Sequence, residues 1–96
     1  MNYHFEWDPV KAACNLKKHG VSFEEAVEIF IDPLQLSILD DANEGEERWV
    51  TLGSTKADKL RLVVHTFMVC HDQQITIRII SARRATRYEQ KQYKEA

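Results

Sequence analysis

Two long runs of aliphatic and β-branched residues, 60–70 and 75–82, are separated by only four residues of mostly polar character. Runs of this kind joined by a short polar link are typical of a β-hairpin. Both runs carry apolar side chains at odd and even positions, which predicts central strands covered on two faces. A chain of 96 residues has room for one hydrophobic core. The hairpin is therefore expected at the centre of a single domain spanning residues 1–96.

Capping and stop signals predict two helices before the hairpin. Asp8 is a good helix N-cap, and Pro9 suits the first helical position. Gly20 suits the left-handed residue that follows a last helical turn, so the first helix is expected between these signals. Residues 22–25, Ser-Phe-Glu-Glu, form a capping box that predicts a second helix, which Asp-Pro at 32–33 ends.

Alternation of apolar and polar residues predicts the remaining strands. It marks a short first strand over 3–7, another after Pro33 and a third over 48–53. A second capping box at 86–89 predicts a short C-terminal helix. This order of elements predicts an α+β fold with an antiparallel sheet of about four to five strands, two N-terminal helices and a C-terminal helix.

The formal net charge of −2 does not favour nucleic-acid binding, but the charges are unevenly distributed. Residues 24–58 contain ten acidic and two basic residues, whereas residues 59–96 contain eight basic and three acidic ones. This segregation predicts a basic face and an acidic face. Ordinary solvated surface is the alternative.

Signals for targeting and for metal binding are absent from the sequence. No apolar run approaches the roughly 18 residues that span a bilayer, and the N-terminus does not resemble a signal peptide. We therefore expect a cytoplasmic protein without membrane contact. The four histidines and two cysteines lack the spacings of metal sites, so neither a metal nor another cofactor is expected.

The first predicted helix carries a polar stripe that His19 extends beyond the last turn. Its members lie three or four residues apart on one helix face: Asp8, Lys11, Asn15 and Lys18. The stripe is either a solvated helix face or a cationic ridge that holds phosphate.

The register of the central hairpin decides which of its polar side chains meet. A two- or four-residue turn would pair Phe67 with Arg78, and His65 with Ile80. His65 and Arg78 would then share one face, whereas a three-residue turn would separate them. A charged residue within a central strand needs a partner. Arg78 therefore either forms a salt bridge to a carboxylate such as Glu47 or contributes to an anion site.

Ser81, Arg83 and Arg84 follow at the junction between the last long strand and the C-terminal helix. Free backbone N–H groups and two guanidinium groups there could bind phosphate. Helix capping by Ser81 and plain surface charge would explain the same residues.

The sequence resembles the BrnT toxin family over nearly its whole length. The residues that carry the resemblance are 5–8, Lys11, 15–26, 30–33, Glu47, Arg48, Gly53, 77–83, Glu89 and Tyr93. The most specific blocks are Lys-His-Gly-Val-Ser-Phe-Glu-Glu-Ala at 18–26 and Ile-Arg-Ile-Ile-Ser-Ala-Arg at 77–83. The resemblance implies a RelE-like ribonuclease fold and toxicity through RNA cleavage. It also implies neutralisation by a ribbon-helix-helix antitoxin like BrnA, in a hetero-oligomer that binds operator DNA through the antitoxin.

Metal-independent RNA cleavage needs a base near the 2′-hydroxyl, cations for the charge at phosphorus and an acid for the leaving 5′-oxygen. We expect Arg78 and Arg83 to stabilise the transition-state charge. Proton transfer is expected from His65, His19 or Glu47. The residues expected to bind RNA are Lys11, Lys18, Arg48, Ser81 and Tyr93, the last by stacking on a base.

Two other functions would use the same residues. The chain could be a non-catalytic co-repressor that only alters the DNA affinity of an antitoxin. It could also be a protein-interaction module whose basic residues are surface charge. A neighbouring antitoxin gene would distinguish the interaction module from the other two functions. Fragmented RNA after induction would distinguish the toxin from the co-repressor.

Overall fold

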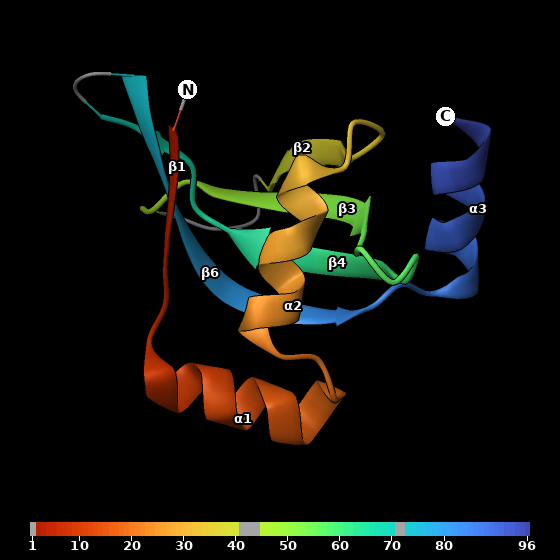
Figure 1. Cartoon of the computed structure of the whole chain (residues 1–96), viewed down its shortest axis with the longest axis horizontal. Coiled ribbons are helices and arrows are strands. Elements are labelled where there is room, and N and C mark those ends of the chain that lie inside the picture. Colours follow the sequence, from red (N-terminus) through yellow and green to blue (C-terminus); the bar gives the residue numbers. More distant parts are fainter. Residues whose placement is uncertain (1, 41–44, 71–72) are drawn as a thin grey trace.

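A twisted mixed sheet forms the frame of the molecule (Figure 1), as seen in a computed structural model that describes residues 2–40, 45–70 and 73–96. In chain order the elements are β1 (Asn2–Glu6), α1 (Pro9–His19), α2 (Phe23–Val27), the 3-10 helix η1 (Glu28–Ile31), β2 (Leu36–Asp40), β3 (Arg48–Ser54), β4 (Leu60–His65), β5 (Met68–Val69), β6 (Gln74–Arg84) and α3 (Arg87–Glu95). The strand order is β1-β6-β4-β3-β2, and β5 also pairs with β6. The α+β class with three α-helices is confirmed.

The central position of the predicted hairpin is confirmed, because β4 and β6 are neighbours inside the sheet. The expected continuous strand over 60–70 is wrong. It is divided into β4 and β5 at residues 66–67, and the pairing of β4 with β6 shifts register between Val64 and His65. Such a bulge places an extra residue in one strand and bends it. The turn predicted around Asp72 lies partly outside the described residues.

The expectation of a purely antiparallel sheet is also wrong. β1 runs parallel to β6, with Tyr3 paired with Ile75 and Phe5 with Ile77, whereas the other pairings are antiparallel. A short turn forces two neighbouring strands to be antiparallel. The two ends of the chain are not joined by such a turn, so β1 is free to align parallel to β6.

Local signals set the helix boundaries much as predicted. The Asp8 side chain accepts a hydrogen bond from the N–H of Val10 (2.8 Å) at the start of α1, and Gly20 has a φ of 72° at its end. Ser22 caps α2 by accepting from the N–H of Glu25 (3.0 Å). The second helix is shorter than a regular α-helix up to residue 31 would be, since the chain tightens into η1 after Val27.

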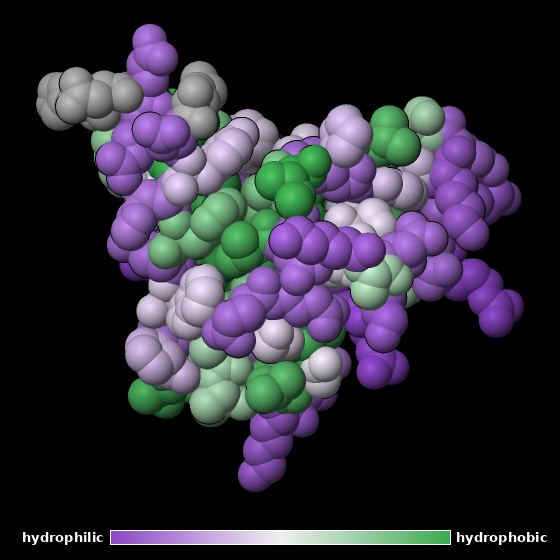
Figure 2. Space-filling view, in the orientation of Figure 1, coloured by the Kyte–Doolittle hydropathy of each residue, from purple (hydrophilic) through white to green (hydrophobic). Residues whose placement is uncertain are grey.

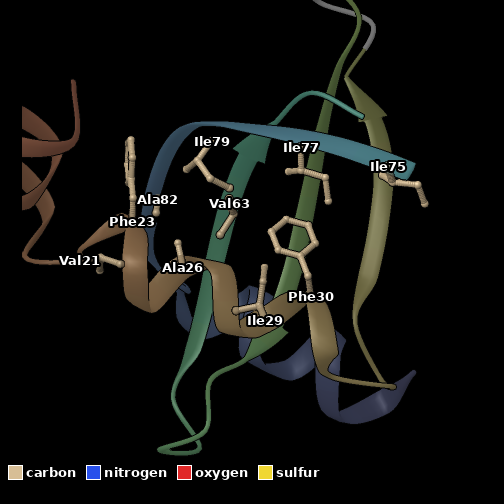
Figure 3. Packing of buried hydrophobic residues seen from close by; sticks show 10 residues of the cluster. All are labelled: Val21, Phe23, Ala26, Ile29, Phe30, Val63, Ile75, Ile77, Ile79 and Ala82. Atoms are coloured by element: carbon tan, nitrogen blue, oxygen red, sulfur yellow. The ribbon is translucent and has the colours of Figure 1, made fainter. Parts of the chain in front are cut away.

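The core lies between the α2–η1 segment and one face of the sheet, here called the inner face (Figure 3). Its buried members are Val21, Phe23, Ala26, Ile29, Phe30, Val63, Ile75, Ile77, Ile79 and Ala82. The spacing of Phe23, Ala26 and Phe30 puts one helical face against the strands. Alternate residues of β4 and β3 point to the opposite, outer face of the sheet. Seen from the α2 side, hydrophobic patches lie between hydrophilic residues (Figure 2).

The C-terminal helix α3 stands at one end of the sheet and contains no buried residue (Figure 1). The predicted capping box is confirmed, with Thr86 and Glu89 each accepting a hydrogen bond from the other's backbone N–H. Side chains over α3 are mostly hydrophilic (Figure 2). Within the described part of the chain, every helix is too short or too polar to cross a bilayer.

Candidate functional site

A groove runs between α1 and β6. It is lined by Lys11, Cys14, Asn15, Lys18, His19, Ile80 and Ser81 and is called the α1–β6 groove below. Four of these residues, Lys11, Lys18, His19 and Ser81, are predicted site residues. They come from two segments more than sixty residues apart in the sequence.

Asn15 holds α1 against β6 and so builds the groove. Strand β1 pairs only with residues 74–78 of β6, which leaves Ala82 beyond the reach of β1. Asn15 Nδ2 donates to the carbonyl oxygens of Ala82 (2.8 Å) and Val21 (3.0 Å), and Asn15 Oδ1 accepts from the N–H of Ala82 (3.1 Å). The side chain therefore replaces a neighbouring strand at this edge. Asn15 is buried, so its place in a polar stripe on the helix surface is wrong.

The groove carries cations that are not neutralised locally. Among the described residues, no carboxylate lies within 4.0 Å of the ammonium group of Lys11 or Lys18. Both lysines are exposed, and His19 is half-buried at the end of α1. Positive charge in the last turn also stabilises a helix, which accounts for part of this pattern. Two ammonium groups, an imidazole and the Ser81 hydroxyl together can bind an oxyanion and transfer a proton.

A second cationic pocket lies between β4, the end of β6 and α3. Its basic members are Lys59, Arg61, Arg84 and Lys94. Arg61 is bound to Glu25 (Nε to Oε2, 2.6 Å), so the other three supply the available positive charge, against one carboxylate of the lining, Asp58. The guanidinium of Arg84 lies 3.8 Å from the position that a Cβ on Gly20 would take, beside the end of α1. Sequence reasoning considered Arg84 for phosphate binding but missed Lys59 and Lys94, although the basic excess of residues 59–96 was their signal.

His65 lies in the core. Only 2% of its surface is exposed, and its ring meets Phe30 edge-on at 4.8 Å between centroids. Its Nδ1 donates to the carbonyl of Thr66 (2.8 Å) because a carbonyl can only accept. Its Nε2 must then accept from the Thr51 hydroxyl (2.6 Å), which in turn accepts from Ser37 (2.6 Å). Burial lowers the pKa of His65, although the bond to Thr66 opposes that shift.

The predicted register of the central hairpin holds for residues 61–64 with 81–84 and is wrong from His65 toward the turn. His65 is paired with Ile79, not Ile80, and Met68 is paired with Thr76. From His65 to Val69 the pairing has the register of the three-residue alternative, so the predicted meeting of His65 with Arg78 is lost. Arg78 instead forms an ion pair with Glu46. The alternative of a salt bridge therefore holds for Arg78, with Glu46 in place of the expected Glu47.

Arg83 is fixed by a carboxylate at the base of α3. Its two terminal nitrogens each donate to one oxygen of Glu89, both at 2.8 Å. This pairing raises the pKa of Arg83, although burial opposes it. Hydrogen bonding from Arg83 also lowers the pKa of Glu89 to about 2, against a smaller opposing effect of burial. Neither Arg78 nor Arg83 lines the α1–β6 groove.

The remaining predicted residues are also dispersed. Tyr93 donates from its hydroxyl to Asp32 Oδ2 (2.6 Å), which raises the pKa of Tyr93 to about 12. Glu47 is exposed and accepts from the indole N–H of Trp49 (3.3 Å). Arg48 begins β3, opposite Asp40 on β2. Within residues 2–40, 45–70 and 73–96, no group of three or more His, Cys, Asp or Glu side chains is arranged to hold a metal ion.

Comparison with known proteins gives a family model and a structure. Residues 7–89 match a family described as the ribonuclease toxin, BrnT, of type II toxin–antitoxin systems. A crystal structure of the Brucella abortus ribonuclease toxin BrnT matches with a TM-score of 0.61 and 19% sequence identity. That match covers 91% of this chain and 100% of the Brucella chain, and it indicates a shared fold. No curated protein matches the sequence.

Proposed function

Because the chain belongs to the BrnT family of ribonuclease toxins of type II toxin–antitoxin systems, we propose that it is a metal-independent endoribonuclease. On this proposal it inhibits translation and growth by cutting RNA in the cytoplasm. A ribbon-helix-helix antitoxin like BrnA neutralises it, and the complex contacts operator DNA through the antitoxin. One observation carries the assignment of the site. Lys11, Lys18, His19 and Ser81 share one groove, whose lysines have no acidic partner among the described residues.

RNA binding is assigned to a line of cations. Lys11 and Lys18 contact the phosphates nearest the scissile bond. Arg84 lies at the end of α1 and continues the line toward Lys59 and Lys94 in the second cationic pocket. Contacts of this kind depend strongly on salt, because each neutralised phosphate releases counterions.

The proposed chemistry is transesterification at phosphorus. The 2′-oxygen of the ribose attacks phosphorus and loses its proton to His19, while the bond from phosphorus to the 5′-oxygen breaks. The leaving 5′-oxygen takes up a proton, either from His19 or from water. Imidazole suits this role because it exchanges protons near neutral pH. Lys11, Lys18 and the Ser81 hydroxyl stabilise the charge on the phosphorane oxygens.

The roles predicted for Arg78 and Arg83 stay predictions. Each guanidinium is bound to a carboxylate, Glu46 or Glu89, so direct contact with RNA requires the N–H groups that the carboxylate leaves exposed. His65 is too deeply buried to touch RNA in this conformation. We therefore assign the proton transfer to His19 first.

The test is cleavage of an end-labelled RNA by the purified protein in the presence of EDTA. Cleavage is expected to continue in EDTA. His19→Gln is expected to reduce the rate roughly 10²–10⁴-fold, the usual contribution of a general acid or base. Lys18→Ala is expected to weaken RNA binding. It is also expected to reduce the slope of log K against log salt concentration by about one. Lys17→Ala is the matched control, since Lys17 is exposed on the same helix but does not line the groove. Loss of cleavage in EDTA, or full activity of His19→Gln, would refute this assignment.

A non-catalytic co-repressor is the second candidate, and the two arginine–carboxylate pairs favour it. Arg78 and Arg83 are both neutralised within the chain, as expected of structural ion pairs. This candidate predicts that the protein alters the DNA affinity of its antitoxin without cutting RNA. Inducible expression without the antitoxin distinguishes the two candidates. Growth arrest with fragmented RNA supports the ribonuclease, and normal growth with intact RNA supports the co-repressor.

A further inference from the structure

The outer face of the sheet carries an aliphatic groove opposite the core. It is lined by six side chains from three strands, Leu36, Ile38, Val50, Leu52, Leu62 and Val64, and is called the outer groove below. Strand pairing arranges them in two rows across the sheet, Leu36–Leu52–Leu62 and Ile38–Val50–Val64. Arg83, Glu89 and Gln92 form its polar border, and its volume is about 480 Å³.

The outer groove is largely uncovered. Leu52 is its one buried member, the other aliphatic side chains are half-buried or exposed, and Ile38 is 66% exposed. Of the helices in the described part of the chain, α3 alone borders this groove, and it does so with the polar side chains of Glu89 and Gln92. A contiguous apolar surface with a polar border marks an interaction site.

The chemistry of the outer groove excludes two occupants. RNA is bound by cations and aromatic rings, and none of the six lining side chains is either. The chain's own α3 cannot fill the groove, because tyrosines are the only large apolar residues in Arg87–Glu95. The groove therefore requires a partner with an uncharged aliphatic stripe.

The dimensions of the outer groove fit a helix. It crosses from β2 to β6, and three inter-strand spacings of about 4.8 Å give roughly 14 Å. A helix covers that length in about nine residues, or two to three turns. Apolar side chains at i, i+3 or i+4, and i+7 would meet the two rows.

We propose that an amphipathic helix of the antitoxin docks in the outer groove. This proposal rests on the proposed function, since toxins of this family act with an antitoxin. The groove also ends at the proposed RNA site. Val64 in the groove is paired with Ser81, which lines the α1–β6 groove. A helix seated across the strands thus ends beside the cations that bind RNA and blocks access to them.

The test compares glutamate variants of two isoleucines, Ile38 and Ile31, whose side chains are exposed to nearly the same extent. Ile38→Glu places a charge in the outer groove, and Ile31→Glu places the same charge on η1, where the side chain is 68% exposed. The purified antitoxin is the probe, and its Kd is measured by calorimetry with the full-length toxin. Ile38→Glu is expected to weaken binding at least about tenfold, as for a central interface residue. Ile31→Glu is expected to change binding less than about twofold.

RNA cleavage without antitoxin is measured on the same proteins and is expected to be equal for all three. If the wild-type protein binds the antitoxin but cuts no RNA, the proposed ribonuclease activity is refuted. The docking proposal is then decided separately, by comparing the Kd values of the two variants. Equal effects of both variants on Kd would overturn the proposal. So would a wild-type dimer that Ile38→Glu converts to monomers, because a second copy would then occupy the groove. Loss of RNA cleavage in a folded Ile38→Glu with unchanged Kd would also overturn it.

Discussion

Replacing Asn15 with alanine should remove the link that holds α1 to the sheet. The substitution deletes three hydrogen bonds, two to the backbone of Ala82 and one to the carbonyl of Val21. Their polar backbone atoms would remain in a buried position without these partners. A typical buried hydrogen bond contributes about 1 kcal/mol, so the three together contribute about 3 kcal/mol. The better helix propensity of alanine recovers about half a kcal/mol.

The expected loss is therefore about 2–3 kcal/mol of unfolding free energy, out of a total of roughly 5–15 kcal/mol for a domain of this size. For a chain of 60–100 residues this lowers Tm by about 10–20 °C. Urea unfolding followed by circular dichroism gives the free energy and the m value. Cys14→Ala is the matched control, because Cys14 is the exposed neighbour on the same helix and its loss should cost under about 0.5 kcal/mol. A loss below about 1 kcal/mol for Asn15→Ala, or an equal loss for the control, would refute the proposed role of Asn15.

Three further predictions concern the stability of the fold. Burial lowers the pKa of His65 below its usual 6.5, so the unfolded chain binds this proton first. The urea midpoint of the wild type should fall as the pH drops below 6.5. The midpoint of His65→Gln should fall less over the same pH range. Glu89, with a pKa of about 2 against its usual 4.5, stabilises the fold above pH 4.5. Glu89→Gln should cost about 1 kcal/mol at pH 7 after allowance for solvent screening, and the difference should shrink by pH 3. Gly53→Ala should cost about 1–3 kcal/mol in thermal melts, because the new Cβ would lie 2.9 Å from Ile29 Cβ and 3.2 Å from its carbonyl oxygen. An unchanged Tm would show that Ile29 moves aside easily.

Sequence reasoning named all four groove residues of the proposed RNA site, which are Lys11, Lys18, His19 and Ser81. Lys11 and Lys18 were correctly placed on one helix face, because helical periodicity is a local property. The same reasoning assigned Asn15 to that surface stripe, although its side chain is buried against Ala82. A single sequence cannot distinguish a polar side chain that bonds to the unpaired backbone of a strand from one that is exposed to solvent. In the second pocket Arg84 was among the residues considered for phosphate binding, but Lys59 and Lys94 were missed. The three meet only when α3 closes against β4 and β6.

The sequence by itself determined the caps and ends of the helices, the approximate positions of the central strands and the family resemblance. The helix caps and the strands depend on residues within a few positions of one another, so each leaves a readable pattern. The resemblance is carried most specifically by the contiguous blocks 18–26 and 77–83. The tertiary structure decided the parallel pairing of β1 with β6, the register shift at His65 and the carboxylate partners of Arg78 and Arg83. These features depend on contacts between distant segments. One extra residue at a bulge exchanges the two faces of a strand. That residue is Ile80 of β6, so Arg78 lies on the opposite face from the one predicted. His65 faces the core with Val63 in the regular alternation of β4.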